Sequence, residues 1–152
     1  MRTLLKATLL TGALALAGAA AAQGDNPRNE GEKVVASLTG TAEVPGPGDA
    51  DGAGLFEAKI DPQTERICYS LSAGNIAAAT SAHIHSGAPG EAGDVVLTLD
   101  TPDGDDDDSE DCQDIDRGLA QQLIQNPQNY YVNVHNGPHP QGAIRGQLSK
   151  GN

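Results

Sequence analysis

Aromatic and positively charged side chains are both scarce in this chain of 152 residues. It has three tyrosines, one phenylalanine and no tryptophan, and nine Lys and Arg stand against 21 Asp and Glu. Proteins that bind nucleic acid neutralise its phosphates with clustered Lys and Arg, so we expect no nucleic-acid partner. The same repulsion disfavours an anionic membrane surface. The length allows a single domain.

Long apolar runs are also missing, apart from one short stretch near the N-terminus. Two basic residues precede apolar residues 9–16, and Ala20 and Ala22 supply a small-residue cleavage pattern. These features predict a signal peptide over residues 1–22, cleaved after Ala22, and therefore a periplasmic or secreted protein. No later stretch approaches the roughly 18 apolar residues of a membrane-spanning helix, so we expect no membrane insertion.

The chain after Ala22 has few large apolar residues, and their placement indicates the fold. Residues 23–33 are polar and aperiodic, which predicts a disordered tether before a domain over residues 34–149. Within the domain, apolar residues alternate with polar ones in short runs separated by turn-forming clusters. Seven such runs predict strands: 34–39, 54–60, 66–73, 80–85, 94–99, 130–135 and 143–148.

Short strands without long helical stretches between them predict an all-β fold, an antiparallel sandwich. One segment departs from the alternation. Ile115, Leu119 and Leu123 recur at every fourth position, which predicts a short helix over residues 115–125 that covers an open end of the sandwich. The acidic stretch 103–111 is predicted to be a flexible, solvated loop, with weak cation binding as the alternative.

Cys68 and Cys112 are the only cysteines. An even number of cysteines in an exported chain predicts a disulfide between them. The alternative is two reduced thiols.

The four histidines occur in two groups, His83 and His85 in AHIHSG, and His135 and His139 in NVHNGPHP. Because side chains alternate along a strand, His83 and His85 project from one face. If their strand lies beside the strand of His135, three imidazoles converge. Neutral imidazole nitrogen is a ligand for copper and zinc, so the sequence predicts a metal site.

Three further residues belong to this hypothesis as possible supports of the histidines. Tyr131 and Asn133 share a strand face with His135, and Arg145 lies in the middle of the last predicted strand. Arg145 could pair with a buried carboxylate, cap the histidine face or lie exposed. The alternative for the histidines themselves is a structural one, in which their rings are hydrogen-bonded to nearby polar groups. The glycines of SGAPGEAG, residues 86–93, predict a turn with positive φ rather than a phosphate-binding loop.

The segments AHIHSGAPGEAGDVVLTL and NPQNYYVNVHNGPHPQGAIRGQL, together with the ICYSL strand that carries Cys68, resemble the CHRD domain. This module was first described in chordin and occurs alone in exported bacterial proteins. The resemblance covers residues from about 34 to 148 and implies a Greek-key sandwich of immunoglobulin-like or superoxide-dismutase-like type. It implies little about activity, because fold does not determine function.

Three functions follow from these observations. The leading hypothesis is an exported, non-enzymatic binding module that holds copper or zinc through His83, His85 and His135, with His139 as a possible fourth ligand. A structural or protein-interaction domain with an unknown extracytoplasmic partner and no metal is the second. The third is an oxidoreductase, because the H-x-H strand resembles that of copper/zinc superoxide dismutases. No histidine between His85 and His135 is available to bridge two metals, and the acidic charge would repel superoxide.

Overall fold

A computed structural model describes residues 31–102 and 108–152 of the chain. The predicted signal peptide, its cleavage site and nearly all of the predicted tether lie outside these residues. Among the residues described, no helix combines the length and apolar character needed to cross a membrane.

The described residues form nine strands, one α-helix and two short 3-10 helices. In chain order, these elements are β1 (Glu32–Thr39), η1 (Gly40–Ala42), β2 (Ala53–Asp61), β3 (Arg66–Gly74), β4 (Ala79–Ser86), β5 (Val95–Leu99), β6 (Asp108–Asp114), α1 (Arg117–Gln125), η2 (Pro127–Asn129), β7 (Tyr130–Asn136), β8 (Ile144–Gln147) and β9 (Ser149–Lys150).

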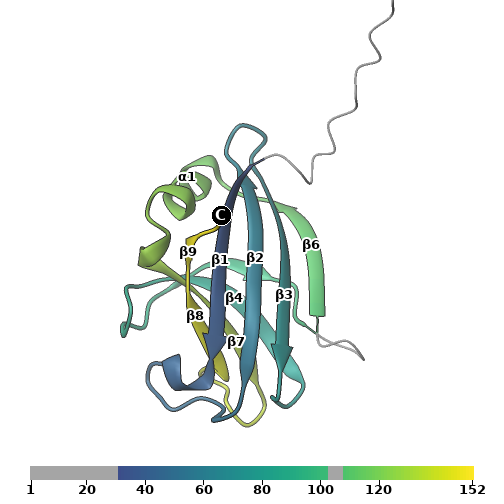
Figure 1. Cartoon of the computed structure of the whole chain (residues 1–152), viewed down its shortest axis with the longest axis vertical. Helices are drawn as coiled ribbons and strands as arrows, with labels where there is room; N and C mark the ends of the chain where they lie inside the picture. Colours follow the sequence, from purple (N-terminus) through teal and green to yellow (C-terminus); the bar gives the residue numbers. More distant parts are fainter. Residues whose placement is uncertain (1–30, 103–107) are drawn as a thin grey trace, which may run out of the picture.

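The strands form two antiparallel layers, which confirms the predicted all-β sandwich. One layer contains β1, β2, β3 and β6, and lies in front of the other, which contains β4, β7 and β8, in Figure 1. β5 extends the second layer beside β4. The layers are continuous at one edge, where β8 pairs with β1 through Thr39 and Arg145. The sandwich is therefore one sheet that curls over its own core.

Strand neighbours that are distant in sequence bring the later functional residues together. β4 pairs with β7, which follows it only after β5, β6 and α1, and β3 pairs with β6. The alternation of side chains places one set between the layers. That core contains Phe56 and Leu71 of the first layer and Ile84 and Val132 of the second, all fully buried.

Three segments differ in kind from the sequence prediction, besides shifts of one residue at several strand ends. β1 begins at Glu32, so the last two residues of the predicted tether are strand residues. The predicted strand 143–148 divides into β8 and β9, because the chain leaves β7 after Gln147 and pairs with β1 at Val34 and Val35. The predicted loop 103–111 was wrong for its last four residues, which belong to β6 and pair with β3.

Helix α1 confirms the predicted short helix, two residues shorter at its start. Asp116 caps it, since its side chain accepts a hydrogen bond from Leu119 N at 3.0 Å. Ala120 and Leu123 are buried, and Figure 1 shows the helix at one end of the two layers.

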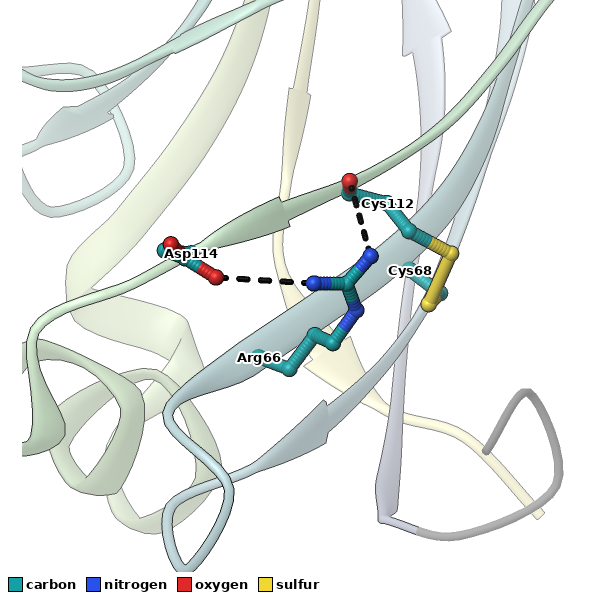
Figure 2. Close-up of a disulfide and its surroundings, with 4 residues drawn as sticks. All are labelled: Arg66, Cys68, Cys112 and Asp114. Atoms are coloured by element: carbon teal, nitrogen blue, oxygen red, sulfur yellow. Dashed lines mark hydrogen bonds and ion pairs between the residues drawn. A yellow bond between two sulfur atoms is a disulfide. The ribbon is translucent and has the colours of Figure 1, made fainter. Parts of the chain in front are cut away.

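The predicted disulfide is present. Cys68 and Cys112 are register partners on β3 and β6, and their sulfur atoms are bonded. Figure 2 shows the guanidinium of Arg66 beside this bridge, where it donates to Cys112 O at 3.4 Å and pairs with Asp114 at 3.5 Å. The bridge therefore ties β6, the acidic edge strand of the first layer, to its neighbour β3.

Candidate metal centre

The outer face of the second layer carries the histidines. The antiparallel register places His83 opposite Asn133 and His85 opposite Tyr131, while His135 lies opposite Ser81. Directly opposite residues of an antiparallel pair project from the same face. The apolar residues between them, among them Ile84 and Val132, face the core, so the same alternation that builds the core aligns the imidazoles outside it.

Three imidazoles meet on this face. One ring nitrogen from each of His83, His85 and His135 lies within 4.8 Å of the other two. The ring centroids are 5.2 Å apart for His83 and His135, 5.5 Å for His83 and His85, and 6.2 Å for His85 and His135. The convergence that the sequence left conditional on strand pairing therefore occurs.

Hydrogen bonds from the second ring nitrogens define the tautomers of two of these histidines. His85 Nδ1 contacts Gly93 O at 3.0 Å, and His135 Nδ1 contacts Pro140 O at 3.2 Å. A carbonyl oxygen can only accept, so each Nδ1 carries the proton, and in the neutral ring each Nε2 carries a lone pair. Metal-binding histidines characteristically donate their other N–H to a carbonyl or carboxylate in this way.

Each histidine of the cluster has one buried ring nitrogen without a hydrogen-bond partner. His83 Nδ1, His85 Nε2 and His135 Nε2 are buried and unpaired. A buried polar atom without a partner costs about 1–3 kcal/mol, and here each of three neighbouring imidazoles carries one. Hydrogen bonding between the rings does not satisfy them.

Electrostatics keep the cluster neutral. Burial lowers the pKa of all three imidazoles from 6.5, and the neighbouring His135 and His85 lower the pKa of His83 further. The charge of Arg145 also lowers the pKa of His85, although the Gly93 carbonyl opposes this effect. At neutral pH the three imidazoles are therefore mostly uncharged, which is the state that a metal ion requires.

Tyr131 lies against His85, and Arg145 lies against Tyr131. The Tyr131 ring stacks on the His85 ring, and Arg145 Cζ lies 3.5 Å from the centre of the same tyrosine ring. Of the three possibilities for Arg145, exposure is wrong, since the residue is 2% exposed. No carboxylate lies within ion-pair distance among the described residues; Arg145 Nη2 instead donates to Ala88 O at 3.1 Å.

The glycine-rich segment 87–94 folds over this stack. Gly93 N donates to Tyr131 Oη at 3.1 Å while Gly93 O accepts from His85, so one residue links both rings. A Cβ at Gly93 would lie 1.6 Å from Ser86 O, which leaves glycine alone compatible with this approach. Gly90 has φ of 83°, which confirms the predicted positive-φ turn.

Glu43 is a site residue that the sequence analysis missed. It is 6% exposed, and its Oε1 accepts a hydrogen bond from Asn133 Nδ2. Burial raises its pKa to about 7, although the charge of Arg145 opposes the shift. The only sequence signal is an acidic residue within the Pro- and Gly-rich turn TAEVPGPGD, which has no strand or helix periodicity.

His139 does not join the cluster. Its Nε2 lies 3.9 Å from Asp49 Oδ2, and its backbone N donates to Asn136 Oδ1 at 2.8 Å. The predicted fourth ligand is thus a residue of the turn after β7. That turn also carries Pro140, whose carbonyl orients His135.

The comparison with protein families agrees with this architecture. A family model for the CHRD domain matches residues 34–148. The chain belongs to the CHRD domain family. Comparison with curated proteins and with solved structures gave no match. The histidine cluster, Glu43 and the disulfide all lie within the CHRD match.

Proposed function

We propose that this CHRD domain is an exported module that binds one copper or zinc ion through His83, His85 and His135. The observation that carries the proposal is that each of the three histidines offers a ring nitrogen within 4.8 Å of those of the other two, and that each has a buried ring nitrogen without a partner. An ion bound to all three would satisfy them together. Imidazole nitrogens suit copper and zinc, whereas calcium and magnesium prefer oxygen ligands.

The electrostatic setting supports binding without prior deprotonation. The lowered pKa values leave the nitrogens free of protons at neutral pH. Carbonyl acceptors already orient two of the rings, so the ligands are arranged before the ion arrives. The predicted signal peptide and the disulfide favour export, since disulfides persist in oxidising compartments.

Isothermal titration calorimetry with zinc or copper(II) at pH 7.5 tests the proposal. We expect saturable binding of about one ion per chain, strongly weakened in His83→Ala and His135→Ala. His139→Ala is the matched control, because it removes an imidazole outside the cluster. Absence of saturable binding, or binding that depends equally on His139, would favour the structural or protein-interaction domain instead.

A further inference from the structure

A fourth side chain on the histidine face is unsatisfied in the same way as the three imidazoles. Asn133 is 3% exposed, and its Oδ1 is buried without a hydrogen-bond partner. It is the register partner of His83 and lies two residues from His135 on the same strand face. A residue with an unsatisfied carbonyl oxygen therefore shares a strand face with the three histidines.

Glu43 determines how this amide is oriented. Asn133 Nδ2 donates to Glu43 Oε1, and an ionised Glu43 would repel the amide oxygen in the reversed orientation. Glu43 itself lies between two backbone walls. A Cβ at Gly48 would lie 2.6 Å from its Cγ, and a Cβ at Gly142 would lie 2.3 Å from its Oε2. Gly48 and Gly142 therefore enclose the carboxyl group of Glu43. Because Asn133 presents its Nδ2 to this group, its Oδ1 does not contact Glu43.

The proposed site thus lacks two partners, a fourth ligand for the ion and a donor for Asn133 Oδ1. Three imidazoles leave one position of a tetrahedral ion to a ligand from outside the protein, while Asn133 Oδ1 lacks a donor. One water molecule can supply both, because its oxygen can complete the coordination of the ion while its O–H donates a hydrogen bond to the amide oxygen. We propose that Asn133, held by Glu43, is the acceptor for the water that completes the coordination of the ion.

The inference rests on the proposed function, and one competing arrangement explains the same oxygen. Arg145 is the register partner of Asn133 on β8, and its buried Nη1 is also unpaired. A water between Arg145 Nη1 and Asn133 Oδ1 would satisfy both without any ion. The guanidinium, however, lies over Tyr131 and donates to Ala88 O, so it is drawn toward the glycine-rich segment.

Carbon and nitrogen NMR of the zinc-titrated protein separates these arrangements. Zinc should move the ring nitrogens of the three cluster histidines and also the side-chain carbonyl carbon of Asn133, which gains a donor. Asn136 is the internal control, since both of its amide atoms already have partners. Shifted histidines with an unchanged Asn133 would overturn this inference alone. Unchanged histidines would overturn the proposed function.

A variant tests whether the acceptor contributes to binding and whether water is present. Asn133→Leu should weaken zinc binding by about tenfold, the usual effect of removing a partner outside the ligand set. Gln121→Leu removes an exposed amide of helix α1 and should leave affinity unchanged. Proton ENDOR of the copper(II) protein should show a strongly coupled proton that exchanges in deuterated water. Its absence, or direct bonding of Asn133 to the ion, would contradict the inference.

Discussion

The rings of His85 and Tyr131 stack face to face, with centroids 4.9 Å apart and planes inclined by 6°. They are register partners on β4 and β7, so the strand pairing itself aligns them. Tyr131 also reaches His85 indirectly, because its Oη accepts from Gly93 N and Gly93 O accepts from His85 Nδ1. The tyrosine therefore supports both the plane of the imidazole and its tautomer.

We predict that Tyr131→Phe weakens zinc binding by about tenfold while the domain remains folded. The substitution keeps the stacked ring but removes the acceptor for Gly93 N, which releases the carbonyl that orients His85. Tyr131→Leu should weaken binding further, since it removes the stack as well. Calorimetry gives the affinities, and circular dichroism checks the fold.

Tyr130→Phe is the control for this prediction. Tyr130 is next in the chain and packs partly against the core rather than on the histidine face. Equal losses in affinity from the two Tyr→Phe substitutions would contradict the assigned role of Tyr131.

The pH dependence of metal binding follows from the lowered histidine pKa values. Protons compete for the ring nitrogens only below the pKa of the folded cluster, which lies below 6.5 for all three residues. Affinity should therefore stay nearly constant from pH 7.5 to 6.5 and fall on further acidification. Calorimetric titrations across this range in weakly coordinating buffers measure it. A midpoint of the fall at or above pH 6.5 would show that the imidazoles are solvated like free histidine.

Glu43 should make the unfolding free energy fall as pH rises. Its pKa is 4.5 when unfolded and about 7 when folded, so between these values the folded state binds more protons. The stabilising contribution is complete below pH 4.5 and is lost as pH rises through 7, a change of about 3 kcal/mol. Glu43→Gln, which still accepts from Asn133, should remove this fall.

Urea denaturation of the metal-free protein at pH values from 4.5 to 8 measures the effect. The histidines contribute a pH dependence of opposite sign, so the difference between wild type and variant isolates Glu43. Glu91→Gln changes an exposed residue of the glycine-rich segment and should follow the wild type. Parallel curves for wild type and Glu43→Gln would mean that Glu43 is not held protonated by burial.

The disulfide should contribute about 4 kcal/mol to the unfolding free energy, because the sequence separation of its cysteines is 44 residues. The double variant Cys68→Ala and Cys112→Ala should show this loss in urea denaturation. Zinc affinity should change little, since the bridge lies on the other layer. A loss below about 1 kcal/mol would indicate that β6 remains paired with β3 without the bridge.

The strand alternation was sufficient to predict much of the fold and part of the site. The common face of His83 and His85 follows from the period of two in a strand and needs no tertiary information. The meeting with His135 does not, because it depends on β4 pairing with a strand that follows four intervening elements. Sequence periodicity describes single strands and carries no record of such long-range neighbours.

The sequence did not predict β6 or the burial of Glu43, because in both places tertiary contacts override the conformational preference of the local residues. The residues of β6 are mostly acidic and poor strand formers, yet they pair with β3, to which Cys112 is bonded through Cys68. Glu43 lies in an irregular segment, and its burial results from packing against Asn133 and Gly142 of distant parts of the chain. Neither environment is encoded in neighbouring residues.

The metal content of the exported protein, purified without a histidine tag from metal-replete cells, tests the central claim most directly. The comparison is between the wild type and a variant with His83, His85 and His135 all replaced by Ala. We predict about one copper or zinc per chain in the wild type and essentially none in the variant, with the same fold by circular dichroism. Equal metal content in the two proteins, or none in the wild type, would contradict the claim.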